Sequence, residues 1–403
     1  MKNKHIVYNR KNKRCVLCAH LFKYFIAMKK YLFLFTATFI WACNCKSEEN
    51  PATTRDPLKW PFSQTSIWNM PIGSDAKYIH AHIEKAMDAG MTIDEDYIVM
   101  SPDTPLMDIA QNFAGWDKTK DRCPVQGEKL FSAPIPQSFI VSPETWDGTT
   151  PNAGLAVLMP DKRTIKHTQP FAHCTASQAG TSQYVFEDVD IYSDGLYGSH
   201  GGSGLSAIGG TLRLGELTPT SGAIHHAMKV NIFGRKNIYY DTETKGYRWP
   251  AKRADGYAAN NYYKDRTSEI VKACRMGALL ALPIKMKLDS LGFETQPARI
   301  LAEAFQHYGA YLVDDTAWDV YAIITEWSPE GRFDEEFKKN WGFSMKVSDK
   351  NTPWGRDMER IFMNLHVVDN NSATTKGGGG KPLVPLAPTL KTFHDRMIEC
   401  RER

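Results

Sequence analysis

Residues Tyr197 to Asn231 read YGSHGGSGLSAIGGTLRLGELTPTSGAIHHAMKVN and set short apolar runs among many glycines. Two of these runs, Gly210 to Leu217 and Ile224 to Phe233, have the length and turn-residue boundaries of β-strands. Glycines such as Gly201 and Gly202 lack a Cβ and let the backbone turn sharply or approach another group, at a cost of about 0.5–1 kcal/mol each inside a regular element. Because ionisable side chains are interleaved with the glycines, we expect this segment to shape a functional site.

The same texture extends outward along most of the chain. Short runs rich in Val, Ile, Tyr and Phe, separated by Gly, Pro, Asn and Asp, occur at Tyr97 to Met100, Ser138 to Val141, Leu155 to Met159, Tyr184 to Tyr192 and Gly277 to Leu282. This pattern predicts a mainly β fold, a β-sandwich or jelly roll. A few peripheral α-helices are predicted at Ile79 to Ala89, Pro297 to Tyr308, Phe333 to Trp341 and Arg356 to Leu365.

The N-terminal region has the pattern of a secretory signal. Met28-Lys29-Lys30 is followed by the apolar run Tyr31 to Trp41 and then by Ala42-Cys43. This run is too short to span a bilayer, which needs about 20 residues. We therefore predict a leader and lipoprotein signal over residues 1–42, lipidation of Cys43, and a lipid-anchored protein of the cell envelope, at the outer membrane or cell surface.

Residues 43–56 are polar and predict a flexible tether, and residues 57–403 predict a single β-rich domain. The glycine-rich stretch at 370–383 favours a flexible tail over a surface loop. Four cysteines outside the signal and tether leave room for one or two disulfides whose pairing stays open: Cys123, Cys174, Cys274 and Cys400.

The charge balance excludes one class of partner. Residues 1–42 hold nine of the 49 basic residues and no acidic residue, so the remaining chain has 40 basic and 45 acidic residues. A net acidic domain without a basic stripe lacks the electrostatic footprint that phosphate binding requires. We expect no nucleic-acid partner.

Four sequence blocks carry a resemblance. They are PFSQTSIWNMPIGSDAKY (61–78), SGLSAIGGTLRLGEL with GAIHHAMKV (203–230), ARILAEAFQHYGAYLVDD (298–315) and VVDNNSATTKGGGGKPLVPLAP (367–388). They resemble a family of secreted bacterial proteins in which some members look like polysaccharide lyases, the marine Bacteroidetes versions being similar to ulvan lyases. The resemblance implies a catalytic domain that cleaves an anionic, uronate-containing and sulfated polysaccharide by β-elimination, and it carries over the motif positions His200, Arg213, Glu216 and His226.

A polysaccharide lyase needs a group that neutralises the uronate carboxylate, a base and an acid. Arg213 suits neutralisation because a guanidinium can bind a carboxylate through two parallel hydrogen bonds. On a strand, Glu216 would lie on the opposite face from Arg213, so we do not pair them. His226 or His200 is the candidate base. Tyr197, Tyr247 or Tyr257 could supply the acid, and we select Tyr257.

Further candidates concern substrate binding and metals. Trp249 could stack on a sugar while Arg248, Lys252 and Arg253 bind its anionic groups. Gln169 and His173 form an amide–imidazole pair. We assign no metal ligand and no cofactor, although calcium stays open at the acidic turn Asp188 to Asp194 and zinc is a minority alternative at His200, His225 and His226.

Each assignment has alternatives. Arg213 could equally be a structural ion-pair partner, and single histidines are more often structural than catalytic. The activity could instead be that of a glycoside hydrolase using Glu216 and Asp255, or the chain could be a non-catalytic surface glycan-binding lipoprotein.

Overall fold

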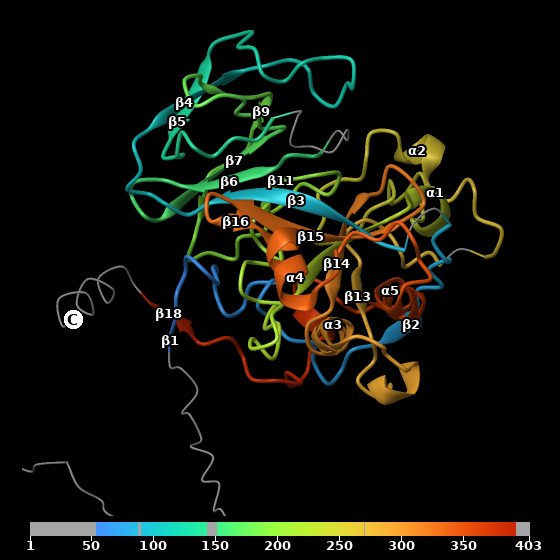
Figure 1. The fold of residues 1–403 in the computed structure, drawn as a ribbon. Coiled ribbons are helices and arrows are strands. Elements are labelled where there is room, and N and C mark those ends of the chain that lie inside the picture. Colours follow the sequence, from blue (N-terminus) through green and yellow to red (C-terminus); the bar gives the residue numbers. More distant parts are fainter. Residues whose placement is uncertain (1–53, 88–89, 143–150, 270, 392–403) are drawn as a thin grey trace, which may run out of the picture. The chain divides into compact units, whose positions relative to one another are not determined.

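The central feature of the fold is a twelve-stranded mixed sheet, seen in a computed structural model that describes residues 54–87, 90–142, 151–269 and 271–391 (Figure 1). Two of its strands lie off the main path: β9 (Tyr184–Val185) pairs with β7, and β16 (Gly331–Arg332) pairs with β15. The main path runs in the order β10 (Val189–Asp190), β7 (Thr164–Gln169), β6 (Leu155–Leu158), β3 (Thr92–Val99), β15 (Tyr321–Ser328), β12 (Met228–Ile232), β14 (Ala310–Asp315), β13 (Leu279–Ala281), β17 (His366–Val368) and β2 (Tyr78–His80).

A second, three-stranded sheet packs against part of the first. It has the order β5 (Lys129–Ala133), β4 (Met107–Gln111) and β8 (Gly180–Ser182). Ile109 and Ala133 from this sheet share a buried cluster with Tyr97 of β3 and Leu155 of β6. The mainly β prediction is therefore confirmed and the arrangement is sandwich-like. The jelly roll is not confirmed, since neighbours such as β3–β6, β3–β15 and β12–β14 run parallel.

Three longer helices cover another part of the large sheet. α3 (Gln296–His307), α4 (Phe333–Trp341) and α5 (Pro353–Met363) bury apolar residues in one cluster with Val230 of β12 and Leu312 of β14. Full burial of each large apolar side chain contributes about 1.5–3 kcal/mol. The helices predicted at 297–308, 333–341 and 356–365 are thus confirmed. The remaining helical elements are short: α1 (Gly234–Asn237), α2 (Ala258–Asn261), η3 (Leu288–Leu291) and η4 (Lys376–Gly378).

The opposite face of the sheet is less uniform. Ile98 and Ile324 on this face pack against Trp68 from the N-terminal region. The apolar residues on either side of Lys229 in β12 belong to the cluster that the helices cover, so Lys229 itself points to the opposite face, toward Trp68. Its Nζ lies 6.0 Å from the Trp68 ring centroid. Polar side chains are therefore buried on a sheet face that is otherwise apolar.

Two predicted elements are wrong. Gly210 to Leu217 is a turn-rich segment with one isolated bridge from Leu212 to Thr325, because Gly210 and Gly215 take positive φ values of 73° and 88°. In the predicted helix Ile79 to Ala89, the described residues 79–87 are not helical: the start lies in β2, and residue 82 then takes a φ of 47°, which no α-helix accommodates.

Other predicted strands are only partly confirmed. Tyr97 to Met100, Leu155 to Met159, Ile224 to Phe233 and Gly277 to Leu282 overlap β3, β6, β12 and β13. Tyr184 to Tyr192 is divided between β9 and β10, and Ser138 to Val141 keeps only an isolated bridge from Val141 to His173.

The tail prediction needs correction, and the predicted tether ends before residue 54. Thr54–Arg55 forms β1, which pairs in parallel with β18 (Thr389–Leu390). The buried Arg55 guanidinium donates to the carbonyls of Trp60, Pro61 and Phe62. In the glycine-rich stretch, Gly377 and Gly378 are buried and take positive φ values of 66° and 87°. Residues 54–56 and the glycine-rich stretch are therefore built into the fold, while residues 43–53 of the predicted tether lie outside the described residues.

Cys123 and Cys174 form a disulfide, and Cys274 is buried and free. Cys400, Cys43 and the predicted leader lie outside the described residues. Among the described residues, no helix is long and apolar enough to cross a membrane. The described residues belong to one structural unit.

Candidate functional site: an aspartate–histidine cluster

Arg213 is a structural residue. Its Nε lies 2.7 Å from Oε2 of Glu326 in β15, and its Nη2 lies 3.4 Å from Oε1 of the same carboxylate. The two side chains are only 12% and 5% exposed. Burial acts to raise the pKa of Glu326, but attraction and hydrogen bonding from Arg213 outweigh it and lower that pKa. The expectation that Arg213 neutralises a uronate is wrong, because its charge is already paired in the interior.

His226 is occupied in the same way. Its Nε2 lies 2.9 Å from Oε2 of Glu216, an oxygen that also accepts the Arg213 backbone N–H at 2.7 Å. Burial acts to lower the pKa of His226, but Glu216 outweighs it and raises that pKa, which does not suit a general base. The turn brings Glu216 back over Arg213, which the strand interpretation had excluded. The adjoining cavity measures about 10 Å³, room for one water and not for a sugar.

The predicted substrate-binding residues are also engaged in the fold. Gln169 and His173 are 2% and 1% exposed, so neither can contact a polymer. Arg248 donates to Oδ1 of Asp369 at 3.3 Å, and Trp249 is half-buried against the apolar core. The assignments of Gln169 and His173 are therefore wrong, whereas those of Arg248 and Trp249, which are only partly buried, stay predictions.

The acidic turn holds no shared calcium site. Asp188 pairs with Lys166 at 2.7 Å, Asp190 pairs with Arg163 at 2.6 Å, and the third carboxylate, at position 194, has its own lysine partner. His200 and His226 belong to separate hydrogen-bond networks, so the zinc alternative at the three histidines is not supported either.

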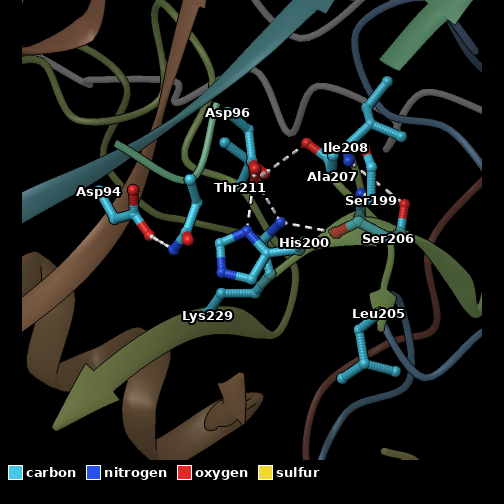
Figure 2. Close-up of polar contacts among 12 residues, drawn as sticks. Asp94, Asp96, Ser199, His200, Leu205, Ser206, Ala207, Ile208, Thr211 and Lys229 are labelled. Carbon is cyan, nitrogen blue, oxygen red and sulfur yellow. Dashed lines mark hydrogen bonds and ion pairs between the residues drawn. The ribbon is translucent and has the colours of Figure 1, made fainter. Parts of the chain in front are cut away.

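His200 stands at the centre of a different network. It ends β11 (Tyr197–His200), is 1% exposed, and its Nδ1 lies 2.9 Å from Oδ1 of Asp96. The other Asp96 oxygen accepts Lys229 Nζ at 2.5 Å and Thr211 Oγ1 at 2.8 Å (Figure 2). Burial acts to raise the pKa of Asp96, but Lys229 and His200 outweigh it and the pKa is lowered. Asp96 is therefore an ionised anchor that holds one edge of the imidazole.

Two further carboxylates face His200. Asp94 and Asp96 are two positions apart in β3, so their side chains lie on the same face of the strand. Asp314 lies near the end of β14. Asp94, His200 and Asp314 offer one ligand atom each, all within 4.8 Å of one another. We call Asp94, Asp96, His200 and Asp314 the aspartate–histidine cluster. It contains three side chains that could hold a metal ion.

Amide groups bridge the carboxylates. Asn152 Nδ2 donates to Oδ2 of Asp94 at 3.0 Å and to Oδ2 of Asp314 at 2.7 Å. Asn231 Nδ2 donates to the same Asp94 oxygen at 3.1 Å. In the sheet, Asn231 of β12 is directly opposite Asp314, next to a β-bulge. The register thus brings residues from three strands to one point.

Negative charge is in excess at the cluster. Burial, followed by repulsion from Asp255 and Asp94, raises the pKa of Asp314 well above its usual range. Burial also raises the pKa of Asp94, although His200 opposes it. Carboxylates in such a site either take up protons or share a cation.

The rim of the cluster is polar and reaches solvent. Tyr257 is 46% exposed, and its hydroxyl is hydrogen-bonded to Asp315. Burial, then repulsion from Asp255 and Asp315, raises the pKa of Tyr257. Burial, joined by repulsion from Asp255, raises the pKa of Asp315 to about 7. Tyr262 donates its hydroxyl to Asp255 at 2.5 Å.

Gly201 and Gly202 pack closely against carboxylates of this region. Exposed Arg253 donates to the carbonyls of Gly201 and Gly202 at 3.2 Å each. A Cβ on Gly201 would stand 1.8 Å from Oδ2 of Asp314. The expectation that these glycines permit close approach is confirmed, and the group that approaches is a carboxylate of the cluster.

The structure thus brings together two of the predicted catalytic residues, His200 and Tyr257. It separates them from Arg213 and His226. Asp94, Asp96 and Asp314 were not predicted from the sequence. Two patterns could have pointed to them: the i, i+2 carboxylates in TIDEDY and the acidic end of the block AYLVDD.

Comparison with protein-family models, with curated proteins and with solved structures finds no match for this chain. The resemblance to ulvan lyases therefore stays a prediction.

Proposed function

We propose that the protein is a polysaccharide lyase that cleaves an anionic, uronate-containing and sulfated polymer of the ulvan type by β-elimination. It acts at the aspartate–histidine cluster, in the cell envelope, where Cys43 carries the lipid anchor. The observation that supports this most is the rim of the cluster. An exposed phenol, an exposed guanidinium and a half-buried carboxylate lie together there, at Tyr257, Arg253 and Asp315.

Neutralisation of the uronate carboxylate is assigned to Arg253. Its hydrogen bonds run to backbone carbonyls, so its charge is not bound in a buried pair like that of Arg213. A guanidinium in this position can still direct N–H groups to a carboxylate or sulfate. A divalent cation, for which the sequence analysis left calcium open, would supply the same neutralisation if bound at the cluster.

The proton transfers are assigned to the Tyr257–Asp315 pair. The Asp315 carboxylate accepts the proton beside the uronate carboxylate, and the resulting carbanion forms the ring double bond as the glycosidic C–O bond breaks. Tyr257, protonated at neutral pH because its pKa is raised, donates its proton to the leaving oxygen. The hydrogen bond between the two side chains returns the proton from Asp315 to Tyr257. His200 is too buried to act as the base and instead organises the cluster.

Ultraviolet absorbance of the unsaturated uronate product tests the proposal. Ulvan, alginate, pectin and glycosaminoglycans would each be incubated with the protein and with a Tyr257→Phe variant. Loss of the acid should lower the rate by about 10²- to 10⁴-fold. Tyr263→Phe is the matched control, since Tyr263 stacks on Tyr239 and lies outside the proton-transfer pair. No absorbance rise on any uronate polymer would rule out the lyase.

The same assay covers the two alternatives. A glycoside hydrolase would release reducing ends without the chromophore. Its predicted carboxylates do not form a pair, since Glu216 bonds to His226 while Asp255 bonds to Tyr262. A glycan-binding protein would retain the polymer on an affinity gel and release no oligosaccharide.

A further inference from the structure

We infer that Asp94, His200 and Asp314 form a binding site for a divalent transition-metal cation of the manganese or zinc class. This goes beyond the proposed reaction, because it concerns an ion that the protein binds whether or not it cleaves a polysaccharide.

The His200 imidazole has one ring nitrogen bound by the fold and one without a partner among the described residues. Its Nδ1 lies 2.9 Å from Oδ1 of Asp96, which leaves Nε2 as the ring nitrogen available to a ligand. That Nε2 is buried and has no hydrogen-bond partner among the described residues. A buried polar atom without a partner destabilises the fold unless a ligand satisfies it. The native fold therefore holds a buried, unpartnered nitrogen atom at this position.

Two carboxylates lie close to the His200 imidazole. The carboxylates of Asp94 and Asp314 lie with His200 in a group whose ligand atoms are all within 4.8 Å. Metal–ligand bonds of about 2.0–2.2 Å place ligand atoms within about 4.4 Å of one another, so small side-chain movements suffice to bind an ion. Asp314 is 5% exposed, and Asp94 is half-buried.

The supporting contacts have the form that metal sites require. A metal-bound histidine usually donates its other N–H to a carboxylate, which fixes the ring. Asp96 has this position and is itself held by Lys229 and Thr211 (Figure 2). An amide oxygen of Asn231 is also buried and without a partner among the described contacts. The second layer around the three ligands is thus already assembled.

The donor set decides the class of ion. Calcium takes six to eight oxygen ligands, whereas imidazole suits transition metals and carboxylates suit harder ions such as manganese. One imidazole with two carboxylates therefore favours manganese or zinc over calcium. This differs from the calcium that the sequence analysis left open.

Metal analysis of the purified full-length protein tests the inference. After equilibration with MnCl₂ or ZnCl₂ and desalting, we expect about one ion per chain, and a melting temperature that rises with the ion and falls with EDTA. CaCl₂ at the same concentration should give a smaller shift. Electron spin-echo spectra of the Mn²⁺ form should contain a nitrogen coupling from one imidazole, a readout that needs no variant.

Variants then locate the ion. His200→Gln and Asp314→Asn should each weaken Mn²⁺ binding at least tenfold, while His226→Gln, which breaks a histidine–carboxylate pair of similar burial elsewhere, should not change it. If the parent protein binds no Mn²⁺ or Zn²⁺, or binds it without nitrogen coupling, the inference is wrong even if lyase activity is found. If the ion binds as expected but no polymer is cleaved, the metal site stands and the proposed reaction fails.

Discussion

Replacing Arg213 with alanine separates a structural role from a catalytic one. The substitution removes the partner of Glu326, whose side chain is 5% exposed. Breaking a buried ion pair costs about 3–5 kcal/mol because one charge is left unpaired. Glu326 keeps the hydrogen bond from the Leu214 N–H at 2.9 Å, so we expect a loss near the lower end, about 3 kcal/mol.

Urea denaturation followed by tryptophan fluorescence measures this loss. Arg235→Ala is the control, since its ion pair with Asp265 is exposed, and it should change stability little. A double variant, Arg213→Met with Glu326→Gln, removes both charges while keeping an acceptor for the Leu214 N–H, so it should recover much of the lost stability.

Activity per folded molecule completes this test. We expect Arg213→Ala to retain it, because Arg213 lies outside the aspartate–histidine cluster. A stability change below about 1 kcal/mol, combined with a hundredfold loss of lyase rate, would refute the structural assignment.

Three further predictions concern the stability of the folded protein. Burial lowers the pKa of His167 to about 4. The free energy of unfolding should therefore fall by about 3 kcal/mol as the pH drops from about 6.5 to 4. Denaturation curves recorded at each pH should show that His167→Gln abolishes this part of the pH dependence. Gly201→Ala should lower the melting temperature and weaken metal binding, because its Cβ would displace Asp314; unchanged melting and binding would contradict this. Removing the Cys123–Cys174 disulfide, which closes a loop with a sequence separation of 51, should cost about 4 kcal/mol in the chain-entropy model, and an unaltered urea midpoint for the double serine variant would count against it.

Much of the fold could be predicted from local pattern. The spacing of apolar residues in α3 and the composition of β3 and β6 indicate their structures. The pattern of apolar residues within one helix or strand is enough to show which of its faces is buried. The segment 210–217 could not be predicted this way. Its alternating apolar residues fit a strand, but positive φ at Gly210 and Gly215 turns the chain, and one sequence does not reveal φ.

The candidate site was predictable only in part. His200 and the glycines beside it were singled out because they combine ionisable and conformationally permissive residues. Asp94 and Asp314 were missed because they are more than 200 positions apart and meet only through the order β3–β15–β12–β14. Arg213 was misassigned because its partner Glu326 lies on β15, over a hundred positions away. Strand order is a long-range property that residue pattern does not contain.

The most direct measurement compares lyase rates for Tyr257→Phe and for the Arg213→Met/Glu326→Gln double variant on the same uronate polymer, per folded molecule. If the aspartate–histidine cluster is the active centre, the first should lose at least a hundredfold and the second should keep the parent rate. A parent-like rate for Tyr257→Phe, together with an inactive double variant that is fully folded, would place the chemistry at Arg213 and contradict the assignment.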